Sequence, residues 1–160
     1  MSGVAVMAMS LHEAAKSGDV AAVRRLVASG ADVEEPGESG ATPLHWAAAY
    51  GWVEVMRVLV EAGSDMEAKN VHGRTPLHVA AAFGEAEAMK MLVKAGAEME
   101  ATNVHGETPL HLAAGNGHVV AMQVLVELGA EMDAKGDRGA TSLHQAVIVF
   151  QMRGQPANTT

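Results

Sequence analysis

Thr42-Pro43-Leu44-His45 is the stretch that decides the fold, because it recurs at a fixed interval along the chain. The same four residues return as Thr75-Pro76-Leu77-His78 and as Thr108-Pro109-Leu110-His111, each time 33 residues later. One further step gives Thr141-Ser142-Leu143-His144, and one step backwards gives Ser10-Leu11-His12. A repeat of this length predicts a solenoid, in which each unit packs on its neighbours.

Each copy of the motif predicts the start of a short helix. Threonine is a good N-cap residue because its hydroxyl accepts a hydrogen bond from an unpaired backbone amide, and proline suits the first helical position, where an N–H would have no partner. Gly51, Gly84 and Gly117 follow nine residues after each threonine. Glycine readily takes the left-handed conformation that ends a helix, so these residues bound the first helix of each repeat.

A second helix is predicted after each of these glycines. In the second repeat Val55, Met56, Leu59 and Val60 have the spacing of one apolar helix face, and the next two repeats keep the pattern. The helix ends at a further glycine, which is Gly63, Gly96 or Gly129. The polar stretch that follows, with a glycine just before the next threonine, predicts a finger that contains a turn.

Two helices and a finger, opened by Thr-Pro-Leu-His-x-Ala-Ala, resemble the ankyrin repeat, which has 33 residues, a β-turn and two helices. The resemblance covers about residues 9–149. It implies an all-α solenoid of stacked helix-turn-helix units with β-turn fingers, comprising four repeats and a C-terminal half repeat. The ends depart from the pattern, since Met9 and Ser10 replace the threonine and proline of the first repeat and Ser142 replaces the proline of the last.

We expect one domain built from these units. The predicted segments are an N-terminal tail 1–8, a capping repeat 9–41, repeats 42–74, 75–107 and 108–140, a truncated repeat 141–153 and a tail 154–160. In the truncated repeat the apolar run 146–150 continues through the place where earlier repeats have glycine. We expect its helix to reach about Met152 and its uncovered surface to support weak self-association or to contact a missing domain.

Composition narrows the classes of partner. The net charge is −8 and only 11 lysines and arginines are present, scattered along the chain, whereas binding of nucleic acid needs clustered positive charge. No stretch approaches the roughly 20 apolar residues that cross a bilayer, and residues 1–9 lack the basic start and cleavage site of a signal peptide. We therefore expect a soluble intracellular protein, cytoplasmic or nuclear, that binds neither nucleic acid nor membrane.

The histidines and carboxylates predict scaffold rather than catalysis. One histidine occupies the same place in every repeat, which indicates a ring nitrogen bonded to backbone near the helix start; these are His12, His45, His78, His111 and His144. His72 and His105 lie on adjacent fingers, and a packing distance of about 8–10 Å is too long for a shared zinc ion. Carboxylates such as Glu98 and Glu100 are predicted to be solvated. We expect no enzyme activity, metal or cofactor.

Comparison of the repeats separates framework columns from variable columns. Paired alanines, such as Ala47-Ala48 and Ala80-Ala81, recur unchanged, which indicates close packing of neighbouring helices. The residue after the motif histidine, the end of the first helix and the finger tip all vary. In ankyrin-like proteins the fingers and first helices form the concave binding face, so the resemblance assigns these variable columns to contact with a partner.

The predicted partner site centres on aromatic residues of the second and third repeats, because tryptophan and tyrosine are enriched among residues that dominate binding energy. It comprises Trp46, Tyr50 and Phe83, rimmed by Val71, His72, Arg74, Val104 and His105. Two alternatives stay open. The aromatic residues could serve packing alone, with Trp46 beside Val79. The acidic finger of Glu34, Glu35 and Glu38 could instead receive a basic group.

The sequence thus predicts a non-catalytic protein-binding module or adaptor. Two other functions fit the same pattern, which are an inhibitory or recruiting subunit of an enzyme and a scaffold that self-associates through its incomplete C-terminal repeat. The variable residues encode complementarity to a partner whose identity the sequence does not contain.

Overall fold

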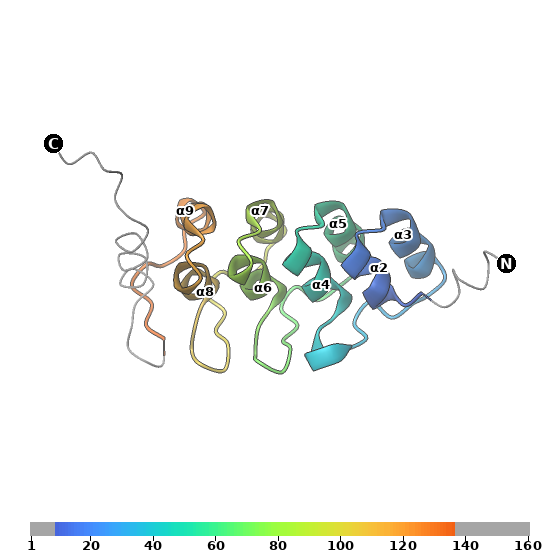
Figure 1. The fold of residues 1–160 in the computed structure, drawn as a ribbon, viewed down its shortest axis with the longest axis horizontal. Coiled ribbons are helices and arrows are strands. Elements are labelled where there is room, and N and C mark those ends of the chain that lie inside the picture. Colours follow the sequence, from blue (N-terminus) through green and yellow to red (C-terminus); the bar gives the residue numbers. More distant parts are fainter. Residues whose placement is uncertain (1–8, 137–160) are drawn as a thin grey trace.

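The computed structural model describes residues 9–136, which form four helix pairs stacked in a row (Figure 1). The first helices of the pairs make one layer, and they are α2 (Leu11–Ser17), α4 (Pro43–Tyr50), α6 (Pro76–Ala82) and α8 (Pro109–Gly115). The second helices make the other layer, and they are α3 (Val20–Ala28), α5 (Val53–Glu61), α7 (Ala86–Lys94) and α9 (Val119–Glu127). The fingers, residues 31–41, 64–74 and 97–107, extend from the first layer, and the 3-10 helix η1 (Glu38–Gly40) lies in the first finger.

The first helices begin at the motif, as predicted. In α4 the Thr42 hydroxyl accepts a hydrogen bond from the His45 amide, while His45 Nδ1 accepts one from the Thr42 amide at 3.0 Å. The same reciprocal cap opens α6 and α8. Two of the amides left unpaired at each helix start are therefore satisfied by side chains.

The first helix of the first repeat begins one residue later than the corresponding helices of the other repeats. Helix α2 starts at Leu11, and its N-cap is Ser10, whose side chain accepts a hydrogen bond from the Glu13 amide at 3.1 Å. Met9, which aligns with the threonines of the other repeats, is therefore not the cap. Methionine has no side-chain oxygen for this role, whereas serine does.

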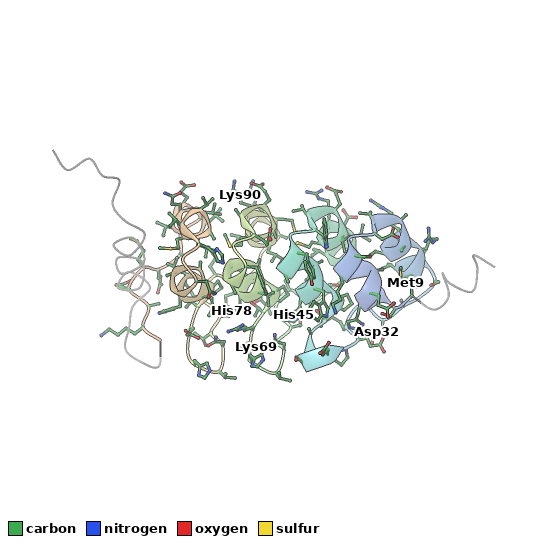
Figure 2. All side chains as sticks on the ribbon, viewed as in Figure 1. Met9, Asp32, His45, Lys69, His78 and Lys90 are labelled. Carbon is green, nitrogen blue, oxygen red and sulfur yellow. The ribbon has the colours of Figure 1, made fainter. Side chains whose placement is uncertain are left out.

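The motif histidines also join neighbouring repeats. Because Nδ1 of His45 accepts from the Thr42 amide, Nε2 carries the proton, and it donates to the backbone carbonyl of Arg74 at 2.8 Å. His78 bonds to the carbonyl of Glu107 in the same way, also at 2.8 Å. Figure 2 places both histidines between the first helices and the fingers. The predicted structural role is confirmed for these two residues, while His144 lies outside the described residues.

The core lies between the two helix layers and between successive repeats. Ala47, Ala48, Ala80 and Ala81 are completely buried, which confirms their predicted place at contacts between first helices. Larger side chains fill the space between the layers, including Leu44, Leu77, Met56 and Met89. Methyl-sized residues allow close helix approach, so the stacking distance depends on the alanine columns.

A column of glutamates makes a second link between repeats that sequence reasoning missed. The carboxylates of Glu34, Glu67 and Glu100 accept hydrogen bonds from backbone amides of the following repeat, those of Asp65, Glu98 and Glu131, at 2.8, 3.0 and 3.0 Å. The prediction that Glu100 is simply solvated was therefore wrong. Burial raises the pKa of the Glu34 carboxyl group. This carboxylate belongs to the acidic finger that was predicted as an alternative binding site, and it already accepts a hydrogen bond from the backbone amide of Asp65.

No helix within residues 9–136 has the length and apolarity needed to cross a membrane. The truncated repeat 141–153, its helix to Met152 and the self-association surface lie outside the described residues. The repeat boundaries given above also stay predictions, because helix positions alone do not test them.

Enlarging a framework alanine is expected to destabilise the fold. Ala81 has no exposed surface, so Ala81→Leu forces extra methylene groups into a filled contact and should lower the free energy of unfolding by about 1–3 kcal/mol. Urea titration followed by circular dichroism measures this change. Ala95→Leu, at the exposed end of α7, is the matched control and should change stability little. Equal stability of the Ala81 variant and the wild type would contradict the packing described here.

Burial makes the stability contributed by His45 and His78 sensitive to acid. Burial lowers the pKa of His45, and it lowers the pKa of His78 to about 4. The positive charges of Arg74 and Lys69 also lower the pKa of His78, whereas its hydrogen bond to the Glu107 carbonyl raises it. An unfolded histidine has a pKa of about 6.5, so the unfolded chain takes up protons first as the pH falls. The contribution to stability is therefore complete above about pH 6.5 and is lost between there and about pH 4.

We expect His78 alone to make the free energy of unfolding fall by about 3 kcal/mol over this range. Urea titrations at pH 7.5, 5.5 and 4.5 test this. His78→Gln lowers stability at pH 7.5 because the cap is weakened, yet its pH dependence should be flatter than that of the wild type. Parallel pH curves for the two proteins would show that His78 does not titrate with folding.

Candidate functional site

An open groove of about 500 Å³ lies between the first two fingers, 31–41 and 64–74, and the first helices of the second and third repeats, α4 and α6. The fingers contribute Glu38, Ser39, Ala41, Asn70, His72 and Arg74, and the helices with their ends contribute His45, Trp46, Ala49, Tyr50, Val79, Phe83 and Glu85. Five of the eight residues predicted for the partner site therefore line one surface, namely Trp46, Tyr50, Phe83, His72 and Arg74. Val71, Val104 and His105 do not line it.

The second finger is held rigidly against the groove. Asn70 Oδ1 accepts hydrogen bonds from the backbone amides of His72 and Arg74, at 2.9 and 3.1 Å. The backbone amide of Asn70 donates to the backbone carbonyl of Arg74. That carbonyl is also the one that His45 binds. The cap of α4 and the finger turn thus share one backbone group, which positions His72 and Arg74 relative to Trp46.

The two predicted valines lie where adjacent fingers stack. The amides of Val71 and Val104 donate to the carbonyls of Ser39 and His72 in the preceding finger, at 3.0 and 3.1 Å. Gly73 has a φ of +71° and no space for a side chain, because a Cβ atom would lie 2.9 Å from the backbone nitrogen of Val104. Although their side chains are mostly exposed, Val71 and Val104 belong to the finger stack rather than to the groove wall.

The aromatic residues of the groove differ in accessibility. Tyr50 and Phe83 are 51% and 61% exposed. Trp46 is half-buried against the core, and Lys16 from the first repeat lies over its ring, with Nζ 4.0 Å from the ring centroid. The open aromatic surface is therefore made by Tyr50 and Phe83, whereas Trp46 is already engaged by a cation.

The charged groups at the groove form no ion pair with residues of the described part of the chain. Within the described part of the chain the ion pairs are Arg57 with Glu54 and Lys90 with Glu87, both on second helices. Arg74 Nε is buried and makes no hydrogen bond to the described residues. Glu85 likewise has no hydrogen bond or ion pair within residues 9–136. The groove thus offers exposed aromatic surface together with unpaired charges of both signs.

Residues 9–136 contain no group of three potential ligands arranged to hold a metal ion. The groove chemistry is that of noncovalent recognition, because aromatic faces supply apolar contact area and the charged groups supply orientation.

Comparison with protein families decides the identity of the scaffold. The family model "Ankyrin repeats (3 copies)" matches residues 11–103 and 96–151. The chain belongs to the ankyrin-repeat family. The resemblance read from the motif is thereby confirmed, and ankyrin repeats are in general protein–protein interaction modules and typically non-catalytic. Comparison with curated proteins gives no match.

One position of this ankyrin chain was missed by sequence reasoning, although it varies as a binding column should. It is the residue after the glycine that ends each first helix, occupied by Asp19, Trp52, Glu85 and His118. Trp52 Nε1 donates to the Lys16 carbonyl and His118 Nε2 donates to the Ala82 carbonyl, both at 2.9 Å. The position therefore contacts the preceding repeat, and through Glu85 it also lines the groove.

The different burial of the aromatic residues predicts different effects on stability. Trp46→Ala should lower the free energy of unfolding by about 1–2 kcal/mol, less than the 3–5 kcal/mol typical of a fully buried aromatic residue, because part of the side chain is already in water. Tyr50→Ala and Phe83→Ala should each change it by less than about 0.5 kcal/mol, as at other exposed positions. Thermal melting of the three single variants tests this order, and a Tyr50 variant less stable than the Trp46 variant would reverse it.

Proposed function

We propose that this ankyrin-repeat chain is an adaptor that binds a segment of a partner protein in the groove between its fingers and first helices. The observation that carries the proposal is the convergence of Tyr50, Phe83, His72 and Arg74 on one groove, where the two aromatic side chains are mostly exposed. Exposed apolar surface that is gathered in one groove often marks an interaction site.

The size and chemistry of the groove support a peptide ligand. Its volume of about 500 Å³ lies in the range of about 300–1,000 Å³ that is usual for ligand pockets, and its open form suits a chain segment. Aromatic anchors contribute much of the binding energy, while surrounding polar residues exclude water and set orientation. Val71, Val104 and His105, on the adjoining fingers, extend the proposed contact surface beyond the groove.

Recruitment or inhibition of an enzyme would use the same groove. The two functions differ in the partner rather than in the surface, since an inhibited enzyme loses activity when the groove is filled and a recruited enzyme keeps it. Identification of the bound protein distinguishes them.

A double variant tests the groove. Tyr50→Ala with Phe83→Ala removes the open aromatic surface while leaving the caps and the alanine columns in place. We expect helicity and melting to be retained and the affinity for the captured partner to fall by at least tenfold, since anchor residues commonly contribute more than about 1.4 kcal/mol. Isothermal titration calorimetry with the purified partner measures this loss.

Val120→Ala is the matched control, because Val120 on α9 is 62% exposed and lies outside the groove. It should bind like the wild type. Undiminished binding by the folded double variant would place the site elsewhere and would refute the proposed function.

A further inference from the structure

The position after the helix-ending glycine has a regular structural role. The last carbonyls of a helix have no partner within the helix, and the negative end of the helix dipole favours a donor or a positive charge there. Trp52 supplies such a donor to the end of α2, through the Lys16 carbonyl, and His118 supplies one to the end of α6, through the Ala82 carbonyl. Both side chains also cover the preceding glycine turn, at Gly18 and Gly84.

Glu85 occupies this position at the end of α4, and it differs from Trp52 and His118 because its side chain has no hydrogen-bond donor. A carboxylate has only acceptors, so it cannot serve the corresponding Ala49 carbonyl. Its carboxylate oxygen Oε2 lies against Gly51, the left-handed residue that closes α4, and the residue is half-buried. Glu85 therefore places negative charge beside the C-terminal end of α4. It is also the N-cap residue of α7, but its side chain makes no capping hydrogen bond, and no cation or donor from the described residues contacts the carboxylate.

The surroundings of Glu85 complete the chemistry of a cation site. Tyr50 directly precedes Gly51, Phe83 lies two residues before Glu85, and all three side chains line the same groove. Aromatic faces attract cations, and the chain shows one such contact where Lys16 lies over Trp46, 4.0 Å from the ring centroid.

The basic side chains of the groove lie at its other end. Arg74 and His72 come from the finger, which leads into the starts of the first helices, whereas Tyr50, Phe83 and Glu85 lie at the ends of those helices. Seven or eight residues at 1.5 Å per residue separate the two ends by about 10–12 Å. The helix ends carry no positive side chain among the lining residues of the groove, and the chain as a whole has a net charge of −8.

We propose that Tyr50, Phe83 and Glu85 form a cation-binding subsite, which receives one arginine or lysine side chain of the segment bound in the groove. The proposal rests on the proposed function and adds the chemistry of the ligand to it. The aromatic rings cover the aliphatic stem and the charged head, and the carboxylate accepts hydrogen bonds from that head. In the free protein this carboxylate has no hydrogen bond or ion pair within the described residues, and the bound side chain supplies one.

Glu85→Gln is the informative variant, because glutamine has nearly the same shape without the charge. Its amide also provides an N–H donor, which can serve the Ala49 carbonyl as Trp52 and His118 serve theirs. We therefore expect the melting temperature of Glu85→Gln to equal or exceed that of the wild type. A purely structural role of the carboxylate requires the melting temperature to fall.

Binding is measured with four immobilised hexapeptide pools whose central residue is arginine, lysine, glutamine or glutamate and whose other positions are mixed. The wild type should be retained more strongly by the arginine and lysine pools than by the other two, and less so at 500 mM than at 50 mM NaCl. Glu85→Gln should bind the two basic pools about tenfold more weakly, since a charge-assisted hydrogen bond is lost, and should bind the glutamine pool unchanged.

Glu61→Gln is the matched control, because Glu61 is exposed at the end of α5 and its loss changes the net charge equally. It should behave like the wild type. The proposal is overturned if the wild type does not prefer the basic pools, if Glu85→Gln keeps the preference, or if Glu61→Gln loses it to the same extent.

The same assay separates this proposal from the proposed function. Suppose that all pools bind the wild type equally and that the Tyr50→Ala, Phe83→Ala variant binds none. The groove is then retained as a binding site, and the cation-binding subsite is refuted. If the double variant binds every pool like the wild type, both proposals are refuted. Loss of all pools by the double variant, with loss of only the basic preference by Glu85→Gln, supports both.

Discussion

A buried neutral imidazole, bonded at both ring nitrogens, is the interaction on which the rest of the structure depends. His45 and His78 are almost completely buried, and each joins the cap of its own helix to the carbonyl that ends the next finger. Burying a polar ring is costly unless its nitrogens are satisfied, so the ring holds both backbone segments in place. The finger with His72 and Arg74 is positioned on α4 for this reason.

The repeated framework leaves function to a few positions that the framework does not need. Caps, alanine columns and glutamate links recur from repeat to repeat, and they satisfy the backbone and set the stacking distance. The position after the helix-ending glycine is different, since Trp52 and His118 support the preceding helix end and Glu85 cannot. A local departure from a rule that the same chain follows elsewhere is a stronger pointer to function than exposure alone.

Lys16 and Trp46 illustrate how a variable column can serve the scaffold. Sequence comparison grouped Trp46 with Tyr50 and Phe83 because all three vary between repeats and are aromatic. In the structure the ring of Trp46 packs on the core under Lys16, while the other two side chains remain open. Variation in sequence therefore grouped residues that line one groove, and burial divides these residues between packing and proposed binding.

The sequence by itself determined the helix starts, the helix ends and the buried alanines, because caps, glycine turns and apolar spacing act over a few residues. The interactions that it left undecided join residues about 30 positions apart, including His45 with Arg74, Glu34 with Asp65 and Trp52 with Lys16. Which side chain meets which backbone group then depends on how one repeat is rotated and displaced on the next. The groove and the place of Glu85 in it were decided only by this stacking, since neither exists within a single repeat.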